Sequence, residues 1–192
     1  MNRALLLVVG LTLGAAGASG TQLRPESPFT LKVIGPGVWA AIDNPRAQAP
    51  SAANAGFVVG DDGVAVIDTF ANIEAAKQLL AKIRKVTNLP IRFVINTHYH
   101  ADHVAGNRIF VDAREVVFAQ QNVRAWIHEE NLRMMTTAAA AANEVIPPEQ
   151  RARVEAFVPP AVVYDEAVDL YLGSRNIHSQ TSRGTRGVTR LS

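Results

Sequence analysis

The chain has 192 residues, of which 48% are hydrophobic and 19% are charged, and it contains no cysteine. This is the composition of a globular protein, and the length predicts a single domain. The formal net charge of +2 is too small to indicate nucleic-acid binding. The lack of cysteine excludes disulfide bonds and thiolate ligands.

The N-terminal segment has the pattern of a secretory signal peptide, which we expect over residues 1–20. Arg3 provides a positive start, residues 4–13 are apolar, and residues 14–20 are rich in small side chains. A transmembrane anchor is the alternative, but the apolar run is shorter than the roughly 20 residues that span a bilayer. The mature chain is therefore expected to be secreted or periplasmic, without stable membrane insertion.

The next part of the chain alternates between apolar and polar residues, which predicts strands. Asn72 can then cap a helix that carries an apolar stripe along one face. Predicted strands lie at 30–34, 37–42, 56–59 and 64–68, and the last two form a hairpin around Asp61-Asp62-Gly63. The stripe consists of Ile73, Ala76, Leu79, Leu80 and Ile83.

From residue 91 onward the predicted strands and helices alternate, which indicates an α/β or α+β fold. Residues 138–142 are an alanine run that is helical by propensity. Strands are predicted at 91–96, 115–119, 162–164 and 168–172, and helices near 103, at 122–132, and between the proline pairs 147–148 and 159–160.

Four possible metal ligands follow the apolar strand 91–96 within six residues: His98, His100, Asp102 and His103. Side chains two apart on an extended segment point the same way, so His98 and His100 can reach one metal. Asp102 and His103 are offset and can reach a second. Imidazole and carboxylate ligands without thiolate suit zinc, and iron or manganese is possible. The end of a strand is also where α/β proteins tend to bind ligands.

Residues 97–107, THYHADHVAGN, resemble the HxHxDH signature of the metallo-β-lactamase superfamily. The neighbourhood agrees, because AGFVV at 55–59 and GVAVIDT at 63–69 are similar to the two strands that precede the family's first helix. Asp68 matches the aspartate that ends the second of these strands. The resemblance extends over residues 29–172, which we expect to form a partial domain of this family.

The resemblance implies an αββα sandwich, present here as its N-terminal half, with two zinc ions at one edge. His98 and His100 would bind the first ion, and Asp102 and His103 the second. A hydroxide bound to the metal, formed because its water has a pKa near about 7, would be the nucleophile. Asp102 would also orient that water, and the metals would stabilise the oxyanion. Asp68 would support the metal loop, although a solvated strand end is the alternative for it.

The sequence departs from the family after this motif. The family completes its site with a histidine in a GH(T/S) motif, a bridging aspartate and a last histidine, and none of these is present. No Asp or Glu follows Asp169, and the only later histidine is His178. Each metal would keep two protein ligands, where a catalytic zinc needs about three. We therefore expect weak metal binding and marginal stability.

Residues 173–192 are polar and basic with little apolar periodicity, and we expect an unstructured, aberrant tail. Residues 184–192 read GTRGVTRLS, and the same nucleotides read one position earlier can encode GHTRGDTVV, which contains the missing histidine motif. The hypothesis is that this tail is a frame-shifted reading. The coding DNA tests it, since no one-base shift would restore the motif if the hypothesis is wrong.

Four further residues are interpreted structurally. His128 lies beside two glutamates in a predicted helix and should be on a solvated face, and His178 is isolated in the tail. Gly106 and Asn107 should shape the loop and the helix start rather than touch substrate.

Two classes of function follow. One is a secreted zinc hydrolase that acts on a small β-lactam, lactone or thioester substrate, impaired in this chain. The other is a catalytically inactive remnant or binding module of the same fold. The oligomeric state and the substrate are not indicated.

Overall fold

The computed structural model describes residues 26–111, 115–181 and 189–191, the last of these for the backbone only. The predicted signal peptide and residues 184–188 of the frame-shift hypothesis lie outside these ranges. None of the helices in the described ranges is both long and apolar enough to cross a bilayer.

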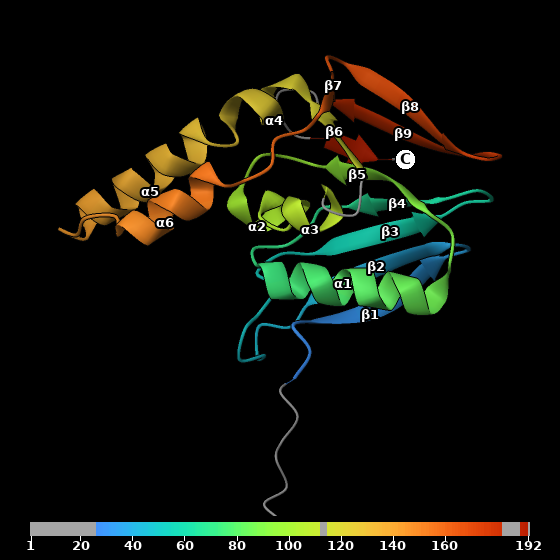
Figure 1. Ribbon diagram of the computed structural model, residues 1–192, viewed down its shortest axis with the longest axis horizontal. Helices are drawn as coiled ribbons and strands as arrows, with labels where there is room; N and C mark the ends of the chain where they lie inside the picture. The colour runs from blue at the N-terminus through green and yellow to red at the C-terminus, as the bar shows by residue number, and fades with distance from the viewer. Residues whose placement is uncertain (1–25, 112–114, 182–188, 192) are drawn as a thin grey trace, which may run out of the picture.

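Two β-sheets and the helices that flank them form an α/β fold, as the alternating pattern predicted (Figure 1). The larger sheet has seven strands in chain order, and the smaller has three in the order β10-β9-β8. The seven are β1 (Phe29–Gly35), β2 (Val38–Asp43), β3 (Ala55–Val59), β4 (Val64–Ile67), β5 (Ile91–Asn96), β6 (Val116–Gln120) and β7 (Val162–Tyr164). The three are β8 (Ala167–Leu172), β9 (Arg175–Thr181) and β10 (Thr189–Leu191).

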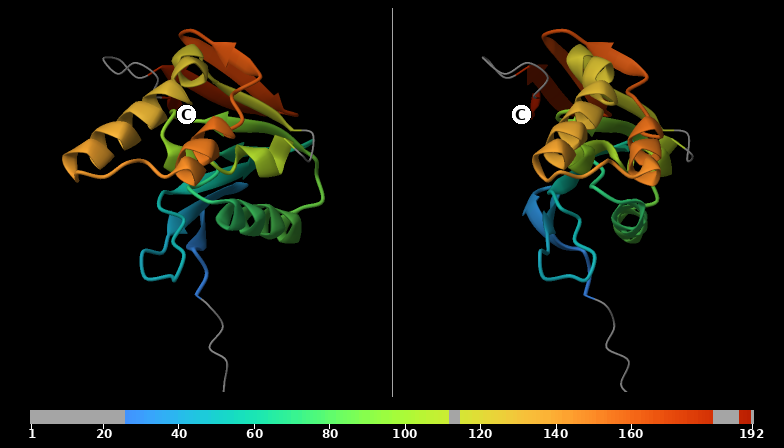
Figure 2. Two further views of the ribbon diagram at one scale, coloured as in Figure 1. Left: turned by 60° about the vertical axis from the view of Figure 1, so that its left-hand side comes forward. Right: turned by 90° about the vertical axis from the view of Figure 1, so that its left-hand side faces the viewer.

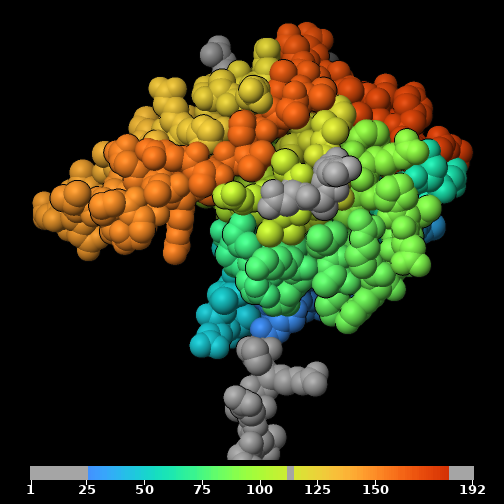
Figure 3. All heavy atoms as spheres, in the orientation of Figure 1, coloured from blue at the N-terminus to red at the C-terminus, as the bar shows by residue number. Residues whose placement is uncertain are grey.

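In the described ranges, six helices connect and cover these strands. Helices α5 and α6 together project from the body of the molecule as an arm, which is clear in the side views and in the space-filling view (Figures 2 and 3). The helices are α1 (Ile73–Val86), α2 (Ala101–Val104), α3 (Asn107–Val111), α4 (Gln121–Trp126), α5 (Glu129–Ala141) and α6 (Pro148–Glu155).

The larger sheet changes from antiparallel to parallel pairing at β4. Strands β1 to β4 are joined as antiparallel hairpins, including the predicted hairpin, in which Val59 pairs with Val64. Strands β4 to β7 are parallel neighbours. The parallel strands therefore all end at one edge, and the loops after β4 and β5 meet there.

The two faces of the larger sheet bury different cores because successive strand residues point to opposite sides. On one face, Phe57, Val66 and Val94 pack against α1 through Leu79 and Ile83. Asn72 caps this helix, its Oδ1 accepting from the backbone N–H of Ala75 at 2.7 Å, as its position predicted. Ile73 differs from the predicted stripe: it is 38% exposed because Ala75 takes the inward position in the first turn.

The opposite face packs against the smaller sheet. Ala65 of β4 and Ile95 of β5 contact Leu170 and Leu172 of β8 and Ile177 of β9. This second core covers the middle of the larger sheet. Strands β1 and β2 contribute no residue to it, so part of this face is left for the groove described below.

The structure corrects the expected unstructured tail at residues 175–181, which form strand β9, and at residues 189–191, which form strand β10 beside it. The residues of β9 pair with β8 from Leu172 opposite Arg175 to Ala167 opposite Gln180. Ile177 and Ser179 are buried on the inward side, and the Ser179 hydroxyl lies 2.7 Å from the Tyr164 hydroxyl. The period-2 pattern was obscured because one of these inward residues is polar and reaches its own hydrogen-bond partner.

The predicted helix at 122–132 is interrupted, and this corrects the interpretation of His128. The chain forms α4, turns at residues 127–128, and restarts as α5. His128 is half-buried at this turn, and its Nε2 lies 2.8 Å from the Phe157 carbonyl oxygen. It therefore links the arm to the segment after α6 and does not lie on a solvated helix face.

The buried carboxylate of Glu115, just before β6, is expected to make the stability of the protein depend on pH. Its side chain is 3% exposed, Oε1 lies 4.0 Å from Arg84 Nη2, and Oε2 has no hydrogen-bond partner among the described residues. Burial raises the pKa of Glu115 despite the opposing effects of a backbone hydrogen bond and Arg84. The folded state therefore holds the proton of Glu115 more tightly than the unfolded state does. The free energy of unfolding falls as the pH rises from the ordinary pKa of glutamate through the raised pKa of Glu115.

We expect Glu115→Gln to raise the free energy of unfolding at neutral pH by on the order of 1 kcal/mol and to flatten its decline above mildly acidic pH. Urea titrations between pH 4 and pH 8 measure both effects, with the pH range set by glutamate titration. Glu74→Gln is the matched control, because Glu74 is exposed on α1. An unchanged pH profile in Glu115→Gln would refute the prediction.

Candidate metal centre

The candidate ligands lie at the edge where the parallel strands end. Strand β5 ends at Asn96, the next four residues are a loop, and α2 begins at Ala101. The segment after β4 runs beside this loop, because the Asp68 N–H donates to the Ile95 carbonyl and the Thr69 N–H donates to the His103 carbonyl, both at 2.9 Å. The segment after β4 therefore holds the histidine loop by hydrogen bonds before its start, at Ile95, and after its end, at His103.

His98 and His100 form the first pair of possible ligands. The Nε2 atom of His98 lies 3.1 Å from Nδ1 of His100, and their rings meet edge to face with centroids 4.6 Å apart. The other nitrogen of His98, Nδ1, lies 3.0 Å from the Thr97 hydroxyl. Each ring thus turns one nitrogen toward the same point, as expected from their spacing of two.

Asp102 and His103 form the second pair. The Nε2 atom of His103 lies 3.5 Å from Oδ2 of Asp102, and its Nδ1 lies 2.7 Å from Oδ2 of Asp68. The carboxylate of Asp68 therefore orients the ring and leaves Nε2 facing Asp102. The two pairs adjoin, since the ring centroids of His98 and His103 are 4.0 Å apart.

Asp68 is buried, which contradicts the alternative of a solvated strand end. Its side chain is 5% exposed. Besides His103, it accepts hydrogen bonds from the Thr97 N–H at 2.8 Å and the Thr97 hydroxyl at 2.6 Å. Its φ of 56° is in the left-handed region, which aspartate tolerates better than most residues. This backbone turn directs the carboxylate toward the histidine loop.

The donor atoms suit zinc in type and spacing. Two ligands about 2.0–2.1 Å from a tetrahedral zinc lie about 3.3 Å apart, and the two pairs here are separated by 3.1 and 3.5 Å. No group of three or more such residues is placed to hold one ion within the part of the chain that the structure describes. Each pair therefore fits as part of a zinc site and lacks its third protein ligand.

The site gives its histidines different proton affinities. Burial, together with the nearby His103, lowers the pKa of His98 to about 4, so this ring is neutral and its lone pair is available near pH 7. Burial also disfavours charge on His103, but the hydrogen bond and charge of Asp68 and the charge of Asp102 outweigh it and raise the pKa of His103. A cation at Nε2 of His103 would therefore compete with a proton.

A buried network of side-chain amides, formed by Asn96 and Asn107, supports the histidine loop. Asn107 donates to the Asn96 side-chain oxygen at 2.8 Å and to the Val158 carbonyl at 2.9 Å. Its Oδ1 accepts from Asn96 Nδ2 and from the Thr69 hydroxyl, each at 3.0 Å. Asn107 therefore has a positioning role, in agreement with the interpretation from the sequence. Val158 ties this network to the segment that follows α6.

Sequence reasoning missed two residues that hold the loop. Thr97 contacts both Asp68 and His98, and its place beside the motif was the available signal. Asn131 of α5 accepts from the Ala101 N–H at 3.0 Å and donates to the Tyr99 carbonyl at 2.7 Å. Nothing in the sequence indicated Asn131, because its position follows from the way the arm folds back onto the loop.

His178 lies apart from the candidate ligands, on β9. Its Nδ1 is 2.9 Å from Asp169 Oδ1 on the neighbouring strand, at the surface. This hydrogen bond lowers the pKa of Asp169 and raises that of His178. The pair is an Asp–His contact outside the candidate centre, so its residues are suitable control positions for variants of the centre.

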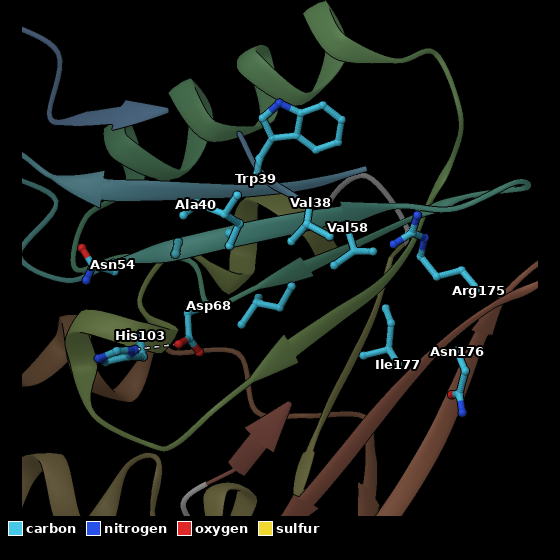
Figure 4. A pocket seen from close by; sticks show the side chains of 14 residues that line it. Val38, Trp39, Ala40, Asn54, Val58, Asp68, His103, Arg175, Asn176 and Ile177 are labelled. Atoms are coloured by element: carbon cyan, nitrogen blue, oxygen red, sulfur yellow. Dashed lines mark hydrogen bonds and ion pairs between the residues drawn. The ribbon is translucent and has the colours of Figure 1, made fainter. Parts of the chain in front are cut away.

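A groove of about 580 Å³ opens beside His103 and Asp68 (Figure 4). Its walls are the face of β2 and β3 that carries Val38, Ala40 and Val58, together with Ile177 of β9. In Figure 4, His103 and Asp68 lie at one end of the view and Arg175 at the other. The groove thus leads from the candidate ligands along an apolar surface.

Histidine and carboxylate donors are thus paired after the parallel strands of the larger sheet. The profile of the metallo-beta-lactamase superfamily matches residues 49–173, and the chain belongs to this superfamily. The resemblance noted from the motif is thereby confirmed, and the chain has a hydrolase-like fold.

Similar proteins include a characterised enzyme and a protein of known structure. A linear primary-alkylsulfatase from Pseudomonas sp. (strain ATCC 19151) is 27% identical over 90 residues, which are 47% of this chain and 17% of that protein. A metallo-beta-lactamase from Pontibacter korlensis matches with a TM-score of 0.53 and 17% identity, over 79% of this chain and 59% of the other. The chain thus spans less than two thirds of either relative.

Proposed function

We propose that this chain is a secreted, zinc-dependent hydrolase of the metallo-beta-lactamase superfamily, impaired by incomplete ligand sets. Its substrate would be a small β-lactam, lactone or thioester. The observation that carries the proposal is the convergence of two donor pairs, with separations of 3.1 and 3.5 Å, at the end of β5. Secretion to the periplasm or beyond rests on the N-terminal sequence pattern alone.

Each residue of the site would have a separate role in this function. His98 and His100 would hold one zinc ion, and Asp102 and His103 a second. Zinc, when bound, lowers the pKa of a coordinated water to about 7 and polarises a carbonyl group. Asp102 would accept a hydrogen bond from water and orient it, and Asp68 would keep the proton of His103 on Nδ1. Thr97 would align the ring of His98.

A binding module without catalytic activity is the second candidate. It is favoured by a specific observation, namely that no three donors in the described ranges are placed around one point. Two protein ligands leave a zinc ion weakly held and poorly oriented. The two candidates differ in turnover and not in fold.

Zinc titration by calorimetry is expected to show weak binding, with dissociation constants of about micromolar or higher. His98→Ala and His103→Ala should each weaken it further, because each removes one donor of a pair. His178→Ala is the matched control and should change nothing, since His178 lies away from the pairs. Tight binding of two ions by the unmodified chain would contradict the proposed impairment.

Hydrolysis of a chromogenic cephalosporin and of a thioester, with zinc added, separates the two candidates. Slow turnover that His98→Ala abolishes and His178→Ala retains would support the hydrolase. Zinc binding without measurable turnover of either substrate would support the binding module. Turnover that persists in His98→Ala would exclude the proposed site.

A further inference from the structure

The groove beside the candidate centre has an apolar floor for a structural reason. In β2 and β3, Trp39 and Phe57 stack on each other with centroids 4.9 Å apart, and Phe57 is buried in the core that α1 covers. Their neighbours Val38 and Val58 must then point to the opposite face. Figure 4 shows these two side chains on the groove side and Trp39 turned away from it.

The wall across the groove comes from β9, where Ile177 projects from the smaller sheet. The described side chains of the smaller sheet pack against β3 to β6 and not against β2, so the β2 part of the apolar face borders the groove. Val38 and Val58 lie opposite each other on the two strands and are half-buried, and Ala40 lines the groove two residues farther along β2. A groove of about 580 Å³ is in the size range of small-molecule sites, which is about 300–1,000 Å³.

The two ends of the groove are polar and unlike each other. His103 and Asp68 lie at one end. Arg175 lies at the other, where its Nη2 donates to the Pro36 carbonyl at 2.9 Å and fixes the guanidinium. No carboxylate lies within ion-pair distance of Arg175 in the described ranges, and the nearby Asp61 is bonded to the backbone and hydroxyl of Ser174. Pro36 is the only hydrogen-bond partner of the Arg175 guanidinium among the described residues, and its other N–H groups can bind an anion.

We propose that the groove binds a linear alkyl or acyl chain that carries an anionic group, with the chain along Val38, Ala40 and Val58 and the anion at Arg175. The opposite end of such a ligand reaches the His103 end of the groove. If the proposed hydrolase function holds, the ligand is the substrate, namely an ester, thioester or amide whose bond lies at His103. The binding itself does not depend on that function.

Calorimetric titration of the metal-free chain with octanoate, decanoate and decanol tests the proposal. Each added methylene should tighten binding by about three- to fourfold, so decanoate should bind about tenfold more tightly than octanoate. Decanol should bind about tenfold more weakly than decanoate, because it lacks the charge. This series uses the unmodified chain and is independent of the folding of any variant.

Four variants, two of them controls, locate the binding. Val58→Glu should abolish binding of decanoate and decanol, while Val145→Glu, on a residue that is 89% exposed near α6, should not. Arg175→Gln should remove the preference for decanoate over decanol. His98→Ala should leave decanoate binding unchanged, so that failure of the hydrolase proposal is distinguished from failure of this one.

Equal affinity for octanoate and decanoate would overturn the proposal. So would decanoate binding that survives Val58→Glu in a folded protein. A third overturning result is a dimer that Val58→Glu converts to a monomer, seen by sedimentation, because the groove would then be an interface between two copies of this chain.

Discussion

Gly106→Ala is expected to lower the free energy of unfolding by about 3 kcal/mol, and the melting temperature by on the order of 10 °C. Gly106 lies in the turn between α2 and α3. A Cβ atom there would meet the Thr69 carbonyl oxygen at 2.1 Å and the Ala76 Cβ at 2.6 Å. Both distances are far inside van der Waals contact, and neither partner is a flexible side-chain end. The backbone between β4 and α1 would have to move.

This steric effect should reach the candidate centre as well as the fold. Thr69, which the new methyl group would displace, bonds to the His103 carbonyl through its N–H. Thermal unfolding followed by circular dichroism measures the stability. Gly35→Ala is the matched control, because its Cβ would meet nothing closer than Val38 at 3.8 Å. Similar losses in both variants would show that close packing at Gly106 is not the cause.

Asp68→Asn is expected to move the proton of His103 from Nδ1 to Nε2. The Thr97 N–H needs an acceptor, so the carboxamide must turn its oxygen to Thr97 and its NH₂ group to His103. An NH₂ group there requires Nδ1 of His103 to accept. Nε2 then carries the proton and loses the lone pair that faces Asp102. Asparagine tolerates the left-handed backbone at this position, so the change is mainly one of chemistry.

We expect this variant to bind zinc roughly tenfold to a hundredfold more weakly and to lose about 1–3 kcal/mol of stability from the impaired hydrogen bonds. A long-range proton–nitrogen NMR spectrum reports the tautomer directly, without metal. Asp169→Asn is the matched control, because it alters the surface pair with His178 and leaves the centre intact. A His103 signal that keeps its proton on Nδ1 in Asp68→Asn would refute the prediction.

The elements that sequence reasoning placed well are those whose signals are local. The hairpin of β3 and β4, the Asn72 cap and the strand before the histidines all depend on neighbours within a few residues, and the structure has them where the pattern predicted. The pairing of His98 with His100 likewise follows from a spacing of two on extended chain. The assignment of these residues as metal ligands stays a prediction.

The features that sequence reasoning missed depend on contacts distant in the chain. Strand β9 was overlooked because Ser179, a polar residue, occupies an inward position and is satisfied by the Tyr164 hydroxyl. His128 looked solvated because its partner, the Phe157 carbonyl, lies 29 residues later. The groove requires knowledge of which part of the larger sheet the smaller one covers, and no periodicity in a single strand reports that.

The arm formed by α5 and α6 projects from the body of the molecule, but Asn131 connects it to the histidine loop. The Asn131 side chain hydrogen-bonds to the Tyr99 carbonyl and to the Ala101 N–H, on either side of His100. A shortened protein in which a brief linker replaces the arm would lose both hydrogen bonds to residues 99–101. The orientation of the His100 ring would then no longer be fixed. Engineering that seeks a smaller scaffold must therefore keep the first turn of α5.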